Sequence, residues 1–310
     1  MKYALILDWR LENSAPCGEK GSFERQRLIE EAEKSGYVGL AMSPTAAKYF
    51  HFFIKRPISH DDLLITRFVS GYSSSQFSDL KQLEDMGHKT MNRPEGLKLA
   101  EDKWETHKLL EKIHIPTAKT MRLSDWQASY WEGHQKLIIK PKDGLSGEGV
   151  ELIDDTSQVE KWQRLPGADN LLVQEFLPRG NEDIRLLVIG NKCLGGIVRR
   201  SAAGEFRSNL SLGGSAERLV VSPEMAALAI RATKAIGLDY AGVDLMWNRT
   251  GSLIVNEVNG TPGFLGTEPI LKINIAKEII KHARDLRSQA QQPAKIDYRF
   301  NYQKRTVISM

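Results

Sequence analysis

The alternation of strand-like and helical segments in the first ninety residues most constrains how this chain can fold. Three short apolar runs alternate with two segments in which apolar residues recur at helical spacing; in chain order they are 3–7, 23–36, 37–42, 63–65 and 78–86. Strands separated by helices join as parallel neighbours, so the pattern predicts a small parallel sheet. The first strand is followed by Asp8-Trp9-Arg10-Leu11 rather than by a Gly-rich fingerprint, which argues against a dinucleotide held there.

A pattern richer in strand pairs follows a group of turn-forming residues at 91–96. We expect a helix over 97–113, then a strand at 137–141 that returns at 150–153 after a Gly-rich turn, and a further strand at 171–176. A hairpin over 184–198 and a helix over 223–236, capped by Ser222, should follow. The last expected elements are strands at 242–247 and 252–258 and a helix over 275–287. The tail from Gln291 is polar. Together these segments predict an α/β protein with antiparallel strand pairs after its parallel sheet.

The composition narrows the class of protein. Of 310 residues, 43 are basic and 39 acidic, so the net charge of +4 gives no reason to expect nucleic acid as a partner. Cys17 and Cys193 are far apart, which argues against a disulfide framework or a zinc site and fits a reducing compartment. No apolar run approaches the ~18 residues of a membrane span, and the first is too short for a signal peptide. We therefore expect a cytoplasmic protein without membrane or nucleic-acid partners.

Acidic and amide side chains on two neighbouring strands near the end of the chain suggest a metal site. Glu257 and Asn259 are two residues apart and so point to one face of a strand, and Asp244 lies on the preceding strand. If the two strands pair, three oxygen ligands converge, two of them anionic, and such a set suits Mg²⁺. The alternative is that these are solvent-facing strand residues.

Two further segments suit a nucleotide, and a third, described in the next paragraph, suits its transferring phosphate. Each also has a simpler interpretation. Lys140 ends a strand before a loop with Gly144, Gly147 and Gly149, whose backbone N–H groups could approach phosphates; an ordinary hairpin turn would look the same. The apolar run 172–177 followed by Asp183 could hold an adenosine, or be an edge strand.

A segment rich in arginine completes the series. It contains Arg199-Arg200 and continues to Arg207 and Asn209, whose fixed donors could stabilise charge on a transferring phosphoryl group. A basic surface loop is the alternative. The seven histidines are scattered and form no grouping with a nucleophile, which agrees with phosphoryl transfer because that chemistry relies on positioning and electrostatics.

Taken in order, these segments resemble the ATP-grasp superfamily, and within it the ribosomal protein S6 glutamate ligase and its RimK-like relatives. The likeness extends to about Arg287 and lies chiefly in Asp183-Ile184-Arg185, Phe206-Arg207-Ser208-Asn209-Leu210, Gly242-Val243-Asp244 and Glu257-Val258-Asn259-Gly260-Thr261-Pro262-Gly263. The runs Asn92-Arg93-Pro94-Glu95 and Ala100-Glu101-Asp102-Lys103 also look like the family's link between domains.

The resemblance implies an α/β fold of three modules. They are a pre-ATP-grasp domain with the parallel sheet over 1–92, a central region with the small α+β lid over 93–173 and a C-terminal ATP-grasp domain over 174–288, followed by a polar tail at 289–310. ATP would lie between the last two domains, and the glycine loop would close over its phosphates.

The resemblance also implies roles for individual residues. The phosphates would be bound by Lys103, Lys140, Ser146 and Gly147. Adenine would be met by Glu175, Phe176 and Leu177, and the ribose by Asp183, with Glu182 as its rival. The transferring phosphate would face Arg207 and Asn209, and two Mg²⁺ ions, or Mn²⁺, would be held by Asp244, Glu257 and Asn259. Arg67, Tyr72 and Ser74 are candidates for contacts to the acceptor, with a surface loop as the alternative. The 244–259 hairpin is longer than the family pattern, a difference expected to alter only its turn.

The implied activity is that of an ATP-dependent carboxylate–amine ligase. A carboxylate would be activated as an acyl phosphate and then attacked by an amine, with an amino acid as the added group and a metabolite, peptide or protein C-terminus as the acceptor. The alternative is a regulatory module that binds nucleotide without ligation. A homo-oligomer is compatible with the resemblance.

Overall fold

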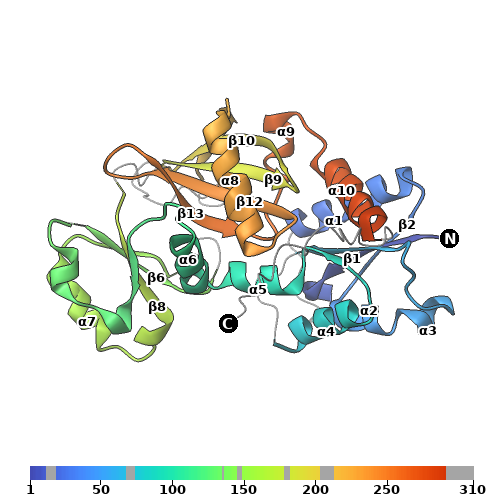
Figure 1. Ribbon diagram of the computed structural model, residues 1–310, viewed down its shortest axis with the longest axis horizontal. Coiled ribbons are helices and arrows are strands. Elements are labelled where there is room, and N and C mark those ends of the chain that lie inside the picture. The colour runs from blue at the N-terminus through green and yellow to red at the C-terminus, as the bar shows by residue number, and fades with distance from the viewer. Residues whose placement is uncertain are drawn as a thin grey trace, which may run out of the picture.

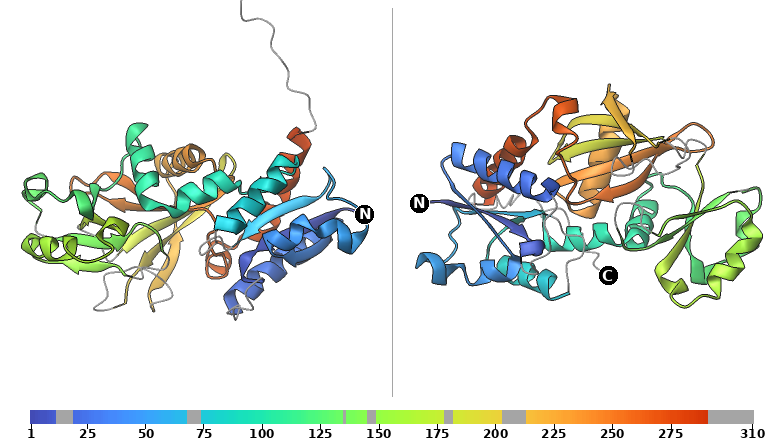
Figure 2. Two further views of the ribbon diagram at one scale, coloured as in Figure 1. Left: turned by 90° about the horizontal axis from the view of Figure 1, so that it is seen from below. Right: turned by 180° about the vertical axis from the view of Figure 1, so that it is seen from behind.

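The computed structural model describes residues 1–11, 19–67, 74–134, 136–144, 149–177, 182–202 and 213–290. Within these ranges the strands form three sheets, which follow one another along the long axis of the molecule (Figure 1). The order of the sheets in space is not their order in the sequence. The C-terminal sheet lies between the N-terminal sheet and the central one (Figures 1 and 2).

The first sheet is parallel, as the alternating pattern predicts. Its strands lie in the order β2 (Val38–Met42), β1 (Tyr3–Asp8), β3 (Leu63–Arg67) and β4 (Thr90–Met91). β1 is apolar on both sides because helices cover both faces. One face packs on α1 (Glu19–Lys34) and α10 (Ile275–Ala290); the other packs on α2 (Pro44–Lys48), α3 (Phe50–Ile54) and α4 (Ser74–Asp85). The chain therefore returns to its first module at α10.

The central sheet is antiparallel. Its order is β5 (Thr120–Arg122), β8 (Leu171–Glu175), β6 (Leu137–Pro141) and β7 (Glu151–Ile153), with α7 (Val159–Gln163) and a small apolar core around Trp131 and Val173. The pairing of β6 with β7 confirms the predicted strand–turn–strand unit. The 3₁₀ turns are η1 (Trp9–Leu11), η2 (Leu123–Asp125), η3 (Ala128–Trp131), η4 (Thr156–Gln158) and η5 (Ala168–Asn170).

The two faces of the C-terminal sheet differ. One is apolar; the other, called the polar face below, carries Arg185, Asp244 and Glu257 together with buried apolar residues such as Leu187. The strand order is β11 (Ser215–Leu219), β10 (Lys192–Arg200), β9 (Glu182–Ile189), β12 (Tyr240–Trp247) and β13 (Leu253–Asn259), all antiparallel. α8 (Pro223–Ile236) covers the face that carries Ile184, Leu186 and Val243. Ser222 caps this helix by accepting a hydrogen bond from the Met225 amide at 3.2 Å, as expected. α9 (Glu268–Leu271) follows the sheet.

The expected single helix over 97–113 is two helices. α5 (Pro94–Glu101) and α6 (Lys103–Lys112) are separated at Asp102, whose backbone is extended and whose carboxylate accepts from the amides of Trp104 and Glu105. Periodicity alone missed this break because Asp102 interrupts the helix without disturbing the apolar repeat. The break makes Lys103 the first residue of α6, beside the central sheet (Figure 1).

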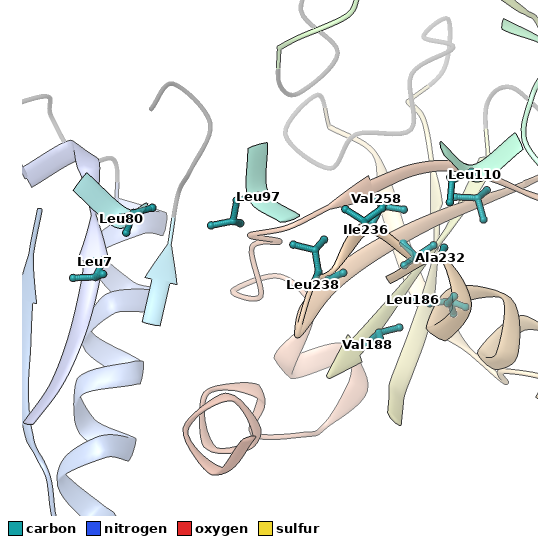
Figure 3. Close-up of a cluster of buried hydrophobic side chains, with 14 of the residues drawn as sticks. Leu7, Leu80, Leu97, Leu110, Leu186, Val188, Ala232, Ile236, Leu238 and Val258 are labelled. Atoms are coloured by element: carbon teal, nitrogen blue, oxygen red, sulfur yellow. The ribbon is translucent and has the colours of Figure 1, made fainter. Parts of the chain in front are cut away.

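Buried contacts connect the N-terminal and C-terminal modules. One apolar cluster extends from Leu7 and Leu80 through Leu97 of α5 to Leu238 and Val258 (Figure 3). Beside it, the buried Asn92 carboxamide donates to the carbonyls of Tyr240 and Gly260 and accepts from the amides of Asp239 and Tyr240. These contacts fix the two modules against each other. No helix of the described residues is of the length and apolarity needed to cross a bilayer.

Candidate active site

A cavity lies where α6, the central sheet and β13 meet. Its polar lining includes Lys103 and His107 of α6, Lys140 and Gln174 of the central sheet, and Glu257 of β13. Three of these residues, Lys103, Lys140 and Glu257, were predicted to act on ATP or its metal from motifs far apart in the sequence. The fold thus brings together two cations and a carboxylate in one cavity.

Lys140 is held by a short hydrogen-bond chain inside this cavity. Its ammonium donates to Gln174 Oε1 at 2.9 Å, the Gln174 amide donates to Thr120 Oγ1 at 2.9 Å, and the Thr120 hydroxyl donates to the Ala118 carbonyl. Lys140 is only 9% exposed. Burial, together with the charge of Lys103, lowers the pKa of Lys140 to about 8, against the opposing effect of Glu257. An anionic ligand would restore the usual preference for the charged form.

Lys103 links α6 to the start of the glycine loop. Its backbone amide donates to the Lys142 carbonyl at 2.8 Å, and its ammonium donates to the Gly144 carbonyl at 2.7 Å. The ammonium therefore lies at the base of the loop that was predicted to cover the phosphates. Ser146 and Gly147, the loop residues predicted to bind phosphate, lie outside the described residues.

Glu175, Phe176 and Leu177 lie where β8 leaves the central sheet toward the C-terminal one. Glu175 Oε1 accepts from the Lys119 amide at 2.9 Å, and Oε2 is 3.8 Å from Arg249 Nε in the β12–β13 turn. The Phe176 amide donates to the Lys136 carbonyl, and Leu177 is buried against Ile254. This segment lies at the edge between the two sheets, and its adenine role stays a prediction.

The predicted metal ligands share the polar face of the C-terminal sheet. In the strand register, Arg185, Asp244 and Glu257 form one row across β9, β12 and β13, and Asn259 lies opposite Gly242 in the next row. Asp244 is 4% exposed and accepts from Arg185 Nε and Nη2, each at 2.7 Å, and from Arg199 Nη2 at 2.8 Å. Burial would raise the pKa of Asp244, but the two guanidinium groups outweigh it and hold that pKa below its usual range.

The donor set fits a hard divalent cation. A carboxylate has about four lone-pair sites, and the three hydrogen bonds at Asp244 leave acceptor capacity on Oδ1. Among the residues that the structure describes, Asn259 Oδ1 accepts a hydrogen bond from the Thr261 amide alone, at 2.8 Å. Within the described ranges no three His, Cys, Asp or Glu side chains gather as a metal cluster, so the set depends on the Asn259 oxygen. Two carboxylates and an amide oxygen are the ligands that Mg²⁺ accepts.

The β12–β13 hairpin is irregular within β13 as well as long in its turn. Asp244 pairs with Glu257 but Leu245 pairs with Val255, so Asn256 is an extra residue and forms a β-bulge. The expectation that the additional length alters only the turn stays a prediction, and the bulge is a second irregularity of this hairpin. The bulge lies next to Glu257, and Asn256 lines the cavity. It keeps Glu257 and Asn259 on the face shared with Asp244.

Asp183 lies on this polar face but is already paired. Arg199 donates to both Asp183 oxygens, from Nε at 2.6 Å and from Nη2, and also to Asp244, so it bridges the two buried carboxylates. The rival residue Glu182 accepts from Arg200 at 2.8 Å. Sequence reasoning gave Arg185 and Arg199 no specific partner. The two-residue spacing of Asp183 and Arg185 was the signal that they share one face.

The candidate acceptor contacts lie at or beyond the end of β3. Arg67 is fully buried: Nη2 donates to Glu24 at 2.6 Å and to the Pro262 carbonyl at 3.1 Å, so it is no surface-loop residue. Ser74 is the first residue of α4. Tyr72 lies outside the described residues, as do Arg207 and Asn209, which were predicted to face the transferring phosphate.

The comparisons with known proteins agree on the family. A family model described as a RimK-like ATP-grasp domain matches residues 100–283. Proteins named probable alpha-L-glutamate ligase are similar over most of their length: that of Legionella pneumophila (strain Corby) is 31% identical over 281 residues, 84% of this chain and 91% of the relative, and that of Xanthomonas campestris pv. campestris (strain 8004) is 33% identical over 276 residues, 84% and 94%.

Solved structures show the same fold. The ATP-grasp ligase PsnB complexed with a minimal precursor superposes with a TM-score of 0.68 at 16% identity, covering 93% of this chain and 100% of that one. D-alanine–D-alanine ligase from Bacillus anthracis complexed with ATP gives 0.67 at 17% identity, covering 93% and 99%. Fold, relatives and family model agree, and the chain therefore belongs to the RimK-like ATP-grasp family.

Proposed function

We infer that this protein is an ATP-dependent carboxylate–amine ligase that forms an amide bond through an acyl phosphate. The observation that carries this inference is the cavity in which Lys103, Lys140 and Glu257 converge between the central sheet and the β12–β13 hairpin. Two lysines beside a carboxylate-bearing strand suit a polyphosphate and its cation. The names of the relatives support ligation, and nothing in the comparisons favours the alternative of a regulatory module without ligation.

ATP would lie across this cavity. Lys103 and Lys140, with Ser146 and Gly147 of the loop, would hold its phosphates; Glu175, Phe176 and Leu177 would meet adenine and Asp183 the ribose; Arg207 and Asn209 would face the transferring phosphate. The inter-sheet position of Glu175 supports the adenine assignment. The ribose assignment requires Asp183 to share its carboxylate between Arg199 and a hydroxyl group.

In the reaction, an oxygen of the substrate carboxylate attacks the γ-phosphorus of ATP, the bond from that phosphorus to the β-bridging oxygen breaks, and ADP leaves. The amine then attacks the acyl carbon, loses a proton and expels inorganic phosphate. Lys140 and Lys103 orient the polyphosphate, and Arg207 would stabilise charge on the transferred group. Mg²⁺, held by Asp244, Glu257 and Asn259, would supply positive charge to the phosphates. Two ions, or Mn²⁺ in their place, belong to the same proposal.

The relatives' names suggest L-glutamate as the amine, and the acceptor is a carboxylate of a metabolite, a peptide or a protein C-terminus. A homo-oligomer and cytoplasmic residence remain predictions from the resemblance and from the cysteine content. Closure of the glycine loop would exclude water, because an exposed acyl phosphate would hydrolyse.

The decisive test measures ADP formation with ATP, Mg²⁺, L-glutamate and pooled carboxylates, dipeptides among them. Turnover is expected to depend on a pool and to fall by about 100-fold or more in Asp244→Asn. Asp285→Asn, an exposed change on α10, is the matched control and should keep full turnover. Equal turnover of Asp244→Asn and the wild type would remove the metal assignment. An inactive wild type that still binds ATP would favour the module without ligation.

A further inference from the structure

A second cavity lies at the amino ends of β3 and β4 in the N-terminal sheet. The C-terminal half of α10, drawn in red in Figure 1, forms its other wall. Its volume, open mouth included, is about 210 Å³, against about 410 Å³ for the active-site cavity. From this cavity β3 runs to Arg67, which contacts the C-terminal module through the Pro262 carbonyl. The cavity is therefore separate from the active site, and its size suits a small ion rather than a nucleotide.

Arg287, in the last turn of α10, lines this cavity and is buried there. The residue is only 7% exposed, and among the described residues its Nη2 has no hydrogen-bond partner. Burial lowers the pKa of Arg287, because the charged guanidinium loses hydration that no neighbour replaces in full. Buried charges in proteins are normally paired and hydrogen-bonded. A buried guanidinium of this kind, in the wall of a cavity, indicates an anionic ligand.

The described carboxylate whose charge acts on Arg287 is committed to other donors. This carboxylate is Asp62, which is fully buried. Its oxygens accept hydrogen bonds from Arg56 Nη1 and Nη2 at 2.9 and 2.8 Å, from the Tyr3 amide at 2.8 Å and from the Ser59 amide at 2.7 Å. A carboxylate has about four lone-pair sites, so these four bonds use the capacity of Asp62. An anion that pairs with Arg287 therefore has to be a ligand.

The remaining polar lining adds positive charge. Met91 packs with residues of α10, and strand alternation puts Lys89, two residues earlier, on the same side, where it is exposed and lines the cavity. The described lining includes no carboxylate. His88 is 6% exposed and its Nδ1 has no hydrogen-bond partner among the described residues. Burial and the charge of Arg287 lower the pKa of His88, so this neighbour adds no compensating or competing charge at neutral pH.

We propose that this cavity is a second ligand site, which binds a small oxyanion, phosphate or a single carboxylate group, through the guanidinium of Arg287 with Lys89 at its mouth. A guanidinium presents its N–H donors in one plane and matches two oxygens of such an anion. Apolar side chains form the rest of the wall and strengthen this pairing by lowering the local dielectric; they are Leu63, Met91, Ala283 and Leu286. The site shares no lining residue with the active-site cavity, so the proposal does not depend on the ligase function.

A ligand at this site would join segments that are distant in the sequence. Its partners come from α10 and from the residue before β4, and β3 supplies part of the wall. Because the unfolded chain does not assemble these groups, an anion that binds the folded protein alone raises the free energy of unfolding by mass action. Binding and stability should therefore change together with the concentration of the anion.

The test titrates the full chain with inorganic phosphate by calorimetry, at neutral pH and with chloride keeping the ionic strength constant. Arg287→Met should weaken phosphate binding by about 10-fold or more, because it removes a charge-assisted pair. Arg284→Met, an exposed change on the same helix, is the matched control and should bind as the wild type does. Lys89→Met, also an exposed change, should weaken binding by about threefold or more.

The thermal midpoint supplies a readout that a purely structural arginine would not give. Without phosphate, Arg287→Met should unfold at or above the midpoint of the wild type, because the variant no longer buries an unpaired charge. With increasing phosphate the midpoint of the wild type should rise, whereas that of Arg287→Met should stay constant. Acetate in place of phosphate identifies the source of the oxyanion: tighter binding of acetate would support the site and assign it to a carboxylate.

Several outcomes would overturn the proposal. One is equal affinity of Arg287→Met and the wild type for both anions, and another is a wild type that binds neither. Binding that is lost in Lys140→Met but kept in Arg287→Met would place the phosphate in the active-site cavity instead. A rise in the midpoint that chloride alone reproduces would reduce the effect to ionic screening. If Arg287→Met fails to fold, Lys89→Met decides, since unchanged affinity in that variant also overturns the site.

Discussion

Arg185 donates two hydrogen bonds of 2.7 Å to the carboxylate of Asp244, from directly opposite positions on the adjacent strands β9 and β12. The pair lies in the row that Glu257 continues on β13. A predicted metal ligand and the cation that balances it are therefore set by strand register rather than by a loop. Substitutions in this row should affect chemistry and folding to different extents, and the following predictions separate the two.

Arg199→Met should destabilise the fold strongly. It removes the guanidinium from which both buried carboxylates, Asp183 and Asp244, accept hydrogen bonds, and removing one partner of a buried ion pair costs about 3–5 kcal/mol. Urea unfolding measures the loss. The double variant Asp183→Asn/Arg199→Met should recover part of it, whereas Arg200→Met, on the exposed side of the same strand, should leave the midpoint nearly unchanged. No recovery in the double variant would show that packing, not the ion pair, sets the cost.

Much of the fold was predictable from local patterns, whereas the site depends on pairings that are distant in sequence. The apolar runs and Ser222 predicted the parallel sheet, the hairpins and α8, because those signals are local. The division of 97–113 at Asp102 was missed because a cap interrupts a helix without altering its apolar repeat. The Arg199 bridge and the Asn256 bulge were not predictable, since each depends on which strands pair and in what register.

Lys140 should make stability depend on pH in the alkaline range. Burial lowers its pKa in the folded protein to about 8, below the usual lysine value, so between these two values the unfolded chain binds more protons. The free energy of unfolding therefore rises with pH between these two pKa values. The destabilising effect of Lys140 is fully present below about pH 8. The advantage of Lys140→Met over the wild type should shrink by on the order of 3 kcal/mol across this pH range. Urea unfolding at a series of pH values measures this; parallel curves would contradict it.

ATP binding should be coupled to proton uptake at the same lysine. Phosphate oxygens beside Lys140 favour its charged form and raise its pKa, so at pH ~8 the complex gains about half a proton. Calorimetric titrations with AMPPNP in buffers of different ionisation enthalpy give this number directly. The uptake should vanish in Lys140→Met, while Lys136→Met, an exposed change next to β6, keeps it. Equal uptake in both variants would place the proton elsewhere.

Asn92→Asp should lower the stability of the folded protein more than so small a change in the side chain suggests. The carboxamide donates to two carbonyls and accepts from two amides, and a carboxylate cannot make the donations. Leaving the Tyr240 and Gly260 carbonyls unpaired should cost about 2–6 kcal/mol, and Asn92→Ala should lose a comparable amount. Chemical unfolding followed by fluorescence measures both. A midpoint near that of the wild type for Asn92→Asp would contradict the proposed link between modules.

Gly242→Ala should reduce activity more than stability, and Gly196→Ala should do the reverse. A Cβ atom at Gly242 would lie 2.8 Å from Pro262 Cβ. It would also fill the space beside Arg185 on the polar face of the sheet. A Cβ at Gly196 instead meets Leu186 Cδ2 at 2.4 Å and Val221 at 3.1 Å, next to α8, where overpacking costs about 1–3 kcal/mol. We therefore expect Gly242→Ala to lose at least about 10-fold in kcat, and because the Pro262 ring has to shift, its unfolding midpoint should also fall to some extent. Gly196→Ala should lower the midpoint while the folded enzyme keeps its kcat. Measuring ADP formation and thermal unfolding on the same preparations decides the matter: equal kcat values for the two variants would mean that the space over Gly242 has no part in the reaction.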